Sequence, residues 1–262
     1  MALIEFKSVG KSYIARSGRN AAAVRDFNLD LQSGEFFCLL GPSGCGKTTV
    51  LAMLAGFELP SRGTIMLDRQ TIDRPSRDRG VVFQGDDSLY PWLTALENIE
   101  FGLRLNHMPK AERQNTAREY LQLVGLGGQQ DKYPGELSGG MKQRIQIARA
   151  LANRPKMLLM DEPFGALDAQ TRGTMQRELR QIWRSSGISV FFITHDIDEA
   201  LVLATRIGIM TAGPGGTLKE VVTVDLDEER VRTNRNYGLL YERIHSSIRE
   251  EVQRSTSLQG AA

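Results

Sequence analysis

The residues with the clearest potential for chemistry lie in the stretch GPSGCGKTT, which covers residues 41–49. The stretch matches the pattern GxxxxGK[ST], in which glycines let successive backbone N–H groups point inward as a nest for an anion. Lys47 would then reach the outer phosphates of a ligand, and the hydroxyl of Thr48 could bind Mg²⁺. A helix that starts near Lys47 would add its positive N-terminal dipole.

The neighbours of this stretch favour a phosphate site over a tight glycine turn that binds nothing. An apolar run over 36–40 precedes it, and the helix-like sequence TTVLAMLAGF follows. A strand before the loop and a helix after it are the context that the motif requires. We therefore predict that the phosphate site is formed by Gly41, Pro42, Ser43, Gly44, Cys45, Gly46, Lys47, Thr48 and Thr49.

A pair of carboxylates follows a second apolar run, in the sequence MLLMDEP over 157–163. At the end of a buried strand, Asp161 could hold Mg²⁺ through water while Glu162 polarises an attacking water. An acidic turn at the protein surface would have the same composition. The pair therefore supports a hydrolytic site only in combination with the phosphate loop.

A third stretch, ELSGGMKQRIQIARALANRP, starts at Glu136 and has the pattern of a capped helix. Ser138 is a good N-cap, and the apolar residues after it recur at helical spacing. Gly139 and Gly140 directly after the cap lower helix propensity, which makes sense if the backbone must approach a ligand closely. That ligand would again be a phosphate at a helix N-terminus.

The elements that must position these residues alternate between apolar runs and amphipathic stretches, as in an α/β protein. Four runs are predicted to be buried strands whose polar ends meet at the ligand-binding edge of a sheet: EFFCLL, VVFQ, KMLLMDEP and ISVFFITHD. Helical spacing dominates from about 85 to 135. After Thr211 the sequence predicts a turn, a strand and a closing amphipathic helix.

These patterns divide the chain into a core and an inserted part. We expect an α/β core over 1–84 and 136–225, which the family resemblance described below implies is an ATPase core, with a helical subdomain over 85–135 that extends into the helix after Ser138. A C-terminal helix is expected over 226–252. The remaining residues, 253–262, are expected to form a disordered tail.

Composition excludes several other classes of protein. The 33 basic and 31 acidic residues give a formal net charge of +2, so general nucleic-acid binding is not expected. Cys38 and Cys45 are interpreted as packing residues in a reduced compartment. The N-terminus lacks a secretory apolar segment. No apolar run is close to the length of about 18 residues that a membrane span requires. We expect a soluble, cytosolic chain.

Taken together, GPSGCGKT, VVFQG, LSGGMKQR, LLMDEP, GALD and ITHD occur in the order found in one known family. From Leu3 to about Val252 the chain resembles the nucleotide-binding subunit of ATP-binding cassette (ABC) transporters. The resemblance implies an α/β P-loop NTPase fold of the RecA-like type, with a mixed-sheet core and an inserted α-helical subdomain. It also implies ATP and Mg²⁺ as ligands, and ATP hydrolysis coupled to transport.

The resemblance assigns roles to five further positions. Tyr13 matches the aromatic residue that stacks on adenine, and Gln84 matches the glutamine that touches Mg²⁺ or the attacking water and senses the membrane partner. Glu162 is similar to the catalytic carboxylate, and His195 to the histidine that contacts the γ-phosphate and orients the water. Asp168, in GALD, matches a loop that crosses to a second subunit; it would also suit the N-cap of the next helix, and both roles can hold at once.

The family also implies the partners. A single phosphate loop covers one side of a triphosphate, whereas transfer to water needs charge stabilisation on the far side as well. In the family that far side comes from Ser138, Gly139 and Gly140 of a second copy, so two chains would pair head to tail around two ATP molecules. The other expected partners are an integral membrane permease and, indirectly, a substrate-binding protein. The dimer would lie peripherally on the cytoplasmic face of the inner membrane.

Within the family, the chain resembles detached subunits of bacterial importers, in particular the subfamily that serves nitrate, sulfonates and taurine. That subfamily typically has leucine-proline-tryptophan where this chain has Tyr90, Pro91 and Trp92, so position 90 departs from it. Trp92 lies in an apolar cluster after Gln84 and is expected to face the permease. An importer for another small solute is an alternative, and so is an ABC ATPase without a role in transport.

Overall fold

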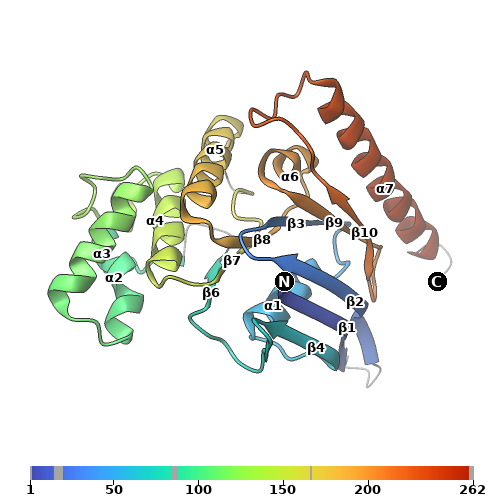
Figure 1. The fold of residues 1–262 in the computed structure, drawn as a ribbon, viewed down its shortest axis with the longest axis horizontal. Coiled ribbons are helices and arrows are strands. Elements are labelled where there is room, and N and C mark those ends of the chain that lie inside the picture. Colours follow the sequence, from blue (N-terminus) through green and yellow to red (C-terminus); the bar gives the residue numbers. More distant parts are fainter. Residues whose placement is uncertain (1, 15–19, 84–87, 166, 260–262) are drawn as a thin grey trace. The chain divides into compact units, whose positions relative to one another are not determined.

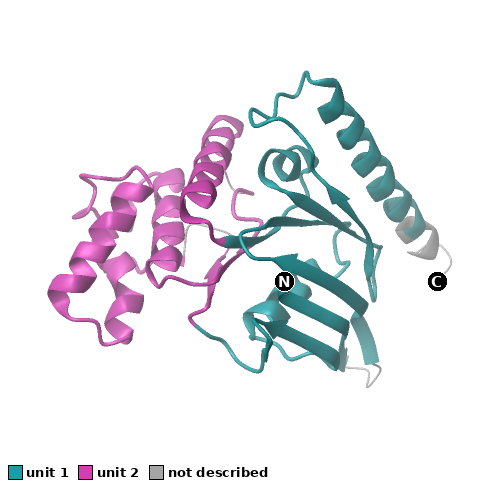
Figure 2. Ribbon diagram, in the orientation of Figure 1, with its two compact units in different colours: residues 1–76, 189–262 teal, residues 77–188 magenta. Residues whose placement is uncertain are grey.

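The computed structural model describes residues 2–14, 20–83, 88–165 and 167–259, with side chains as far as 254. Packing divides the chain into two compact units (Figure 2). Unit 1 contains residues 1–76 and 189–262, and unit 2 contains residues 77–188. The chain therefore leaves unit 1 once, forms unit 2 and returns.

Unit 1 begins with an antiparallel sheet in the strand order β2-β1-β4-β5. Its strands are β1 (Ala2–Ile14), β2 (Asn20–Gln32), β4 (Arg62–Leu67) and β5 (Gln70–Thr71). The register between β1 and β2 shifts between Phe6 and Val9 and at two points after it, which allows this long strand pair to bend. Phe6 and Phe27 meet edge to face across the pair, with ring centroids 5.2 Å apart, and both are buried.

The second sheet region of unit 1 has the strand order β10-β9-β3-β8 (Figure 1). It contains β3 (Phe36–Leu40), β8 (Ser189–Ile193), β9 (Arg206–Met210) and β10 (Leu218–Thr223). β3 pairs in parallel with both β8 and β9, while β10 is antiparallel to β9. All five residues of β3 are buried, as are those of β8, and apart from Ser189 they are apolar, as is typical of parallel strands covered on both faces.

Three helices complete unit 1: α1 (Lys47–Ala55), α6 (Ile197–Leu203) and α7 (Arg235–Gln259). α1 follows the phosphate loop directly and contacts both β2 and β8. α7 is the long closing helix, drawn in red in Figure 1, and it contacts α6 and β9.

Unit 2 contains a short parallel pair, β6 (Arg79–Val82) and β7 (Met157–Asp161), together with helices. The helices are α2 (Ala95–Leu105), α3 (Lys110–Leu123), α4 (Gly139–Ala152) and α5 (Ala169–Ser186), with the short 3₁₀ helix η2 (Pro134–Glu136) before α4. α2, α3 and α4 contact one another and share a core that includes Ile99, Leu121 and Ile145.

The fold class expected from the sequence is confirmed: an α/β P-loop core with a mixed sheet and an inserted helical part. All four apolar runs contain strands, although the strand predicted at VVFQ covers Arg79–Val82. Packing divides the chain near residues 76 and 188, whereas we expected boundaries at 84 and 135.

The C-terminal region differs from expectation in its bounds. α7 begins at Arg235, and it continues to Gln259 through most of the segment expected to be a tail. No glycine or proline interrupts the sequence between Gly238 and Gly260, so nothing local ends the helix earlier. Among the residues that the structure describes, no helix is long and apolar enough to span a membrane.

Candidate functional site

The phosphate loop connects β3 to α1 in unit 1 and adopts backbone conformations that favour glycine. Gly44 has φ +75° and Gly46 has φ +106°. A Cβ atom on Gly46 would lie 2.6 Å from the carbonyl oxygen of Ala23 and 2.8 Å from the side chain of Val24. The loop therefore packs directly against the backbone of β2, and no residue with a side chain fits at position 46.

Lys47 is the first residue of α1, and its side chain folds back over the loop. Its Nζ donates to the carbonyl oxygens of Gly41 at 2.8 Å and Pro42 at 3.0 Å. The side chain is only 8% exposed, so the ammonium is held against carbonyl oxygens that a phosphate oxygen could replace as acceptor. This position fits the role that the motif predicts for the lysine.

The N-terminus of α1 is suited to an anion. Its N-cap residue is Gly46, which has no side chain to cap the helix. The first turn also contains no acidic residue. Its backbone N–H groups and the helix dipole therefore face a loop that offers no negative charge of its own, which is the arrangement of a phosphate site.

Cys45 and Thr48 differ in their surroundings. Cys45 is buried, with its Sγ 4.0 Å from the Sδ of Met210, and burial raises the pKa of its thiol. The protonated thiol is a packing group, as the sequence predicted for both cysteines, and Cys38 is likewise buried and free. Thr48 is exposed in the first turn of α1, so its hydroxyl is accessible to a ligand.

Two other predicted positions of unit 1 lie at exposed places. His195 comes two residues after β8 and is exposed, next to the buried Thr194, whose hydroxyl accepts a hydrogen bond from the Asp196 amide at 3.0 Å. Tyr13, near the end of β1, is 40% exposed, and the ammonium of Lys11 lies 5.1 Å from the centre of its ring. An exposed ring of this kind is available for stacking.

The carboxylate pair lies at the end of β7 in unit 2. Asp161 is the last residue of the strand, and Glu162 follows it with φ +43°. A left-handed backbone is uncommon for glutamate and costs free energy, and such strained residues occur often at functional sites. The next two residues, Pro163 and Phe164, are buried and anchor the turn. Glu162 is therefore held in a fixed, unusual conformation.

The third stretch, ELSGGMKQRIQIARALANRP, is called the signature stretch below, and it contains α4 and its N-cap, as predicted. Ser138 is the N-cap, and its Oγ accepts a hydrogen bond from the Met141 amide at 3.4 Å. Gly140 is buried, and a Cβ there would lie 3.0 Å from the side-chain methyl of Thr171 in α5. Close packing of α4 on α5 thus explains the glycine at 140, a reason that we had not expected. The exposed N-terminal edge at Ser138 is open to a ligand.

Asp168 is the N-cap of α5. Its Oδ1 accepts hydrogen bonds from the amides of Gln170 and Thr171, each at 3.0 Å. Hydrogen bonds from Thr171 lower the pKa of the Asp168 carboxyl. The capping interpretation is therefore correct.

Gln84 and Ala166 lie outside the described residues.

The segment around Trp92 is held by one buried asparagine. Asn98, in α2, is 0% exposed; it accepts a hydrogen bond from the Tyr90 amide at 2.8 Å and donates to the carbonyl oxygens of Tyr90, Leu93 and Thr94. Tyr90 packs on Phe101 with ring centroids 4.5 Å apart. Trp92 is 69% exposed in this segment, so most of its surface is not covered within its own unit.

Two features of these sites were not apparent from the sequence. One is the role of Asn98, which looks like an ordinary polar helix residue. The other is the β9–β10 loop, residues 211–217, whose glycines Gly213 and Gly216 approach the backbone of Gly44 and Cys45. The glycine-rich composition of AGPGG could have signalled a close approach, but not its target.

Comparison with known proteins defines the family. The model of the ABC transporter family matches residues 24–165, which include the phosphate loop, the signature stretch and the carboxylate pair. The chain belongs to the ABC transporter family. Within it, the chain is an ATP-hydrolysing cassette of the kind found in import systems.

Its relatives include subunits of several importers. The nitrate import ATP-binding protein NrtD of Synechocystis is 42% identical over 98% of this chain and 95% of its own length. The taurine import ATP-binding protein TauB of Pseudomonas aeruginosa is 48% identical over 84% of this chain and 83% of its own length. The bicarbonate transport ATP-binding protein CmpC of Synechococcus elongatus is 45% identical over 95% of this chain, which spans only 37% of that protein.

A solved structure of similar fold is the dimeric post-hydrolysis state of an ATP-binding cassette bound to ADP and Pi. It is 32% identical to this chain, with a TM-score of 0.73, and the match covers 86% of this chain and all of that one.

Asn98→Asp tests whether the segment around Trp92 depends on this one side chain. The carboxylate keeps the shape but cannot donate, so it would face the carbonyl oxygens of Tyr90, Leu93 and Thr94 without hydrogen atoms. We expect a loss of about 2 kcal/mol in the free energy of unfolding, measured with urea. Asn115→Asp, at an exposed position of α3, is the control and should change stability little. Equal stability of the two variants would contradict the role of Asn98.

Proposed function

We propose that this chain powers an ABC importer for a small anion such as nitrate, a sulfonate or taurine, acting as a head-to-tail dimer. The observation that best supports the catalytic part is the phosphate loop, where Lys47 is held against backbone carbonyls at the open N-terminus of α1. The relatives support the transport part, because they are named for import of nitrate, taurine and bicarbonate.

ATP would bind with its phosphates in the loop over 41–49. Lys47 would contact the outer phosphates, the amides of the loop and of α1 would surround them, and Tyr13 would stack on adenine. Thr48 and Asp161 offer a hydroxyl and a carboxylate, which are the hard oxygen ligands that Mg²⁺ prefers. Gln84 is the third proposed contact to the ion. Bound Mg²⁺ would supply neutralisation of phosphate charge.

Hydrolysis needs an oriented water molecule. We assign Glu162 as the carboxylate that polarises this water, with His195 and Gln84 orienting it beside the γ-phosphate. The left-handed backbone at Glu162 supports this assignment, since strain is retained where the side chain must point in one direction.

Ser138, Gly139 and Gly140 would act on the nucleotide held by a second copy. The exposed Ser138 at the N-terminus of α4 suits a phosphate that arrives from outside the chain. Asp168 caps α5 and would also lie at this dimer contact. ATP binding would then close the two chains on each other, and hydrolysis would open them.

The dimer would work at the cytoplasmic face of the membrane, attached to a permease that is served by a substrate-binding protein. Trp92 is the residue we propose for the permease contact, because a large exposed aromatic ring on a fixed segment is typical of a binding hot spot. The transported anion would not touch this chain, so its identity follows only from the relatives.

Glu162→Gln tests the catalytic assignment. The amide keeps the shape of the carboxylate but cannot polarise water, so we expect ATP binding to persist and most turnover to disappear. ATP should then trap the dimer, which size-exclusion chromatography would detect. Unchanged hydrolysis and a monomer in the presence of ATP would show that Glu162 has another role.

A mixed dimer tests the head-to-tail arrangement. A Ser138→Arg chain paired with a Lys47→Ala chain has one composite site with both lesions and one with neither. We expect one intact ATP site per mixed dimer and about half of the wild-type hydrolysis if the two sites turn over independently. Two equally inactive sites would contradict composite sites formed across the dimer.

Trp92→Ala tests the membrane contact. If Trp92 is a hot spot, assembly with the proposed permease should weaken by about 2 kcal/mol, while ATP binding by the isolated chain stays unchanged. Capture of the permease by wild type and variant measures the difference. Leu105→Ala, another exposed apolar position in unit 2, is the control. Equal capture, or an unfolded Trp92 variant, would rule out this role.

A further inference from the structure

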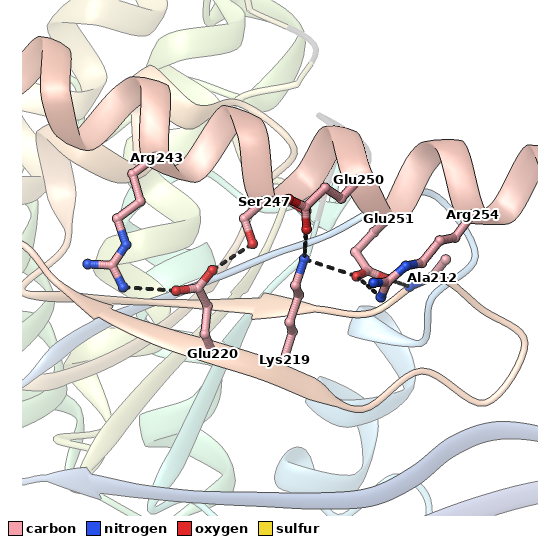
Figure 3. A network of polar contacts seen from close by, with 8 residues as sticks. All are labelled: Ala212, Lys219, Glu220, Arg243, Ser247, Glu250, Glu251 and Arg254. Carbon is pink, nitrogen blue, oxygen red and sulfur yellow. Dashed lines mark hydrogen bonds and ion pairs between the residues drawn. The ribbon is translucent and has the colours of Figure 1, made fainter.

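The C-terminal helix α7 is fixed to the rest of unit 1 by a row of polar contacts (Figure 3). Glu220 of β10 accepts hydrogen bonds from Ser247 at 2.6 Å and from Arg243 at 2.9 Å. Lys219 donates to Glu250 at 2.8 Å and forms an ion pair with Glu251 at 3.0 Å. Most of these contacts join α7 only to β10, but Glu251 also contacts a neighbouring loop.

Glu251 contacts the β9–β10 loop as well as β10. Its Oε2 accepts a hydrogen bond from the backbone amide of Ala212 at 3.1 Å, while its Oε1 pairs with Lys219 and Arg254 (Figure 3). The side chain is only 2% exposed. Burial alone would raise the pKa of this carboxyl, but the Ala212 amide and Lys219 lower it overall. Glu251 is therefore a buried, ionised and fully engaged carboxylate.

The β9–β10 loop that Glu251 holds is in turn packed against the phosphate loop. A Cβ on Gly213 would lie 2.5 Å from the carbonyl oxygen of Gly44, and one on Gly216 would overlap the carbonyl oxygen of Cys45. The carbonyl oxygen of Gly216 also accepts a hydrogen bond from the Arg25 amide at 3.1 Å, next to the part of β2 that packs on Gly46. The phosphate loop is thus supported from both β2 and the β9–β10 loop.

The contacts form a continuous path from α7 to the phosphate loop. Glu251 holds the amide of Ala212, the neighbouring Gly213 touches Gly44, and Gly44 lies in the nest of N–H groups proposed to bind phosphate. We propose that Glu251 is a positioning residue that keeps the β9–β10 loop pressed against the phosphate loop and so sets the affinity for ATP. This inference rests on the proposed function, in which residues 41–49 hold the phosphates.

The alternative is that Glu251 only attaches α7 to β10, as Glu250 and Glu220 do. The two roles differ in what they affect. A purely structural contact would change stability and leave nucleotide affinity alone, whereas a positioning contact would raise the KM and Kd for ATP at temperatures where the chain is folded. Because the change would concern ground-state binding, kcat should change little.

Glu251→Ala compared with Glu250→Ala provides the test. The two residues are neighbours on α7 and share Lys219 as partner, but only Glu251 contacts Ala212. Using the full chain and a fluorescent ATP analogue, we expect Kd to rise about tenfold in Glu251→Ala, as loss of one charge-assisted hydrogen bond implies. KM for ATP should rise with it. Glu250→Ala should remain within about twofold of wild type.

Glu251→Gln provides a second measurement of ATP affinity, one that would not change if Glu251 had only a structural role. Its amide oxygen can still accept from Ala212 but no longer pairs with Lys219 and Arg254 as a charge. We expect it to restore most of the affinity lost in Glu251→Ala. Hydrogen exchange of a peptide that contains residues 41–49 should be faster in Glu251→Ala only.

The contact can also be broken at its other end. Gly213→Ala places a Cβ against Gly44 without touching α7, so it should weaken ATP binding even where Glu251→Ala fails to fold. Gly238→Ala, in an open position of α7, is the control. Wild-type affinity in a folded Glu251→Ala chain, or in Gly213→Ala, would overturn the proposal.

Lys47→Ala separates this proposal from the proposed function. If the Lys47→Ala chain bound the ATP analogue as tightly as wild type, the assignment of the phosphate site itself would be contradicted. Loss of binding in Lys47→Ala together with normal binding in Glu251→Ala and Gly213→Ala would contradict only the role of Glu251.

Discussion

The phosphate loop is packed closely against β2 and the β9–β10 loop. The arrangement of the rest of unit 1 depends on this packing. At Gly46 the loop backbone touches β2, and at Gly44 and Cys45 it touches the glycines of the β9–β10 loop, with no space for a Cβ on the facing glycine. A nest of N–H groups can hold a phosphate only if its backbone is fixed beforehand, because the ligand would otherwise have to order it. The buried strands β3, β8 and β9 provide the rigid base from which the loop emerges.

The side chains proposed to act on ATP share one local feature in both units, because each lies at or soon after the end of a buried strand. Lys47 follows β3 through the phosphate loop, His195 follows β8, and Asp161 with Glu162 ends β7. At helix N-termini, Gly46 offers no capping side chain to α1, whereas Ser138 and Asp168 cap α4 and α5. The apolar part of each element supplies stability, and the polar end is left for chemistry.

Features that depend on neighbouring residues in the sequence could be predicted. The phosphate loop and the carboxylate pair are short motifs at the ends of apolar runs, and the Ser138 cap precedes a stretch of helical spacing. The buried strands can be recognised from their apolar composition. The antiparallel strands β1 and β2 were not predicted, although apolar and polar residues alternate over 27–32 of β2 and 4–7 of β1. Register shifts interrupt the pairing of the two strands between these regular parts. Gly140 and Glu251 owe their roles to partners distant in sequence, which no local pattern encodes. Asn98 bonds to backbone groups only four to eight residues before it, but an asparagine in a helix does not reveal this by its type.

The most direct test of the account is a titration of the isotope-labelled chain with ATP and Mg²⁺, followed through the backbone amide resonances. The account predicts that the amides of Gly44, Gly46, Lys47 and Thr48 shift first, with those of Ala212 and Gly213 following, because the phosphates enter the nest and press on the loop behind it. Unchanged resonances at these positions, with shifts elsewhere or none at all, would contradict the claim that this chain binds ATP through its phosphate loop.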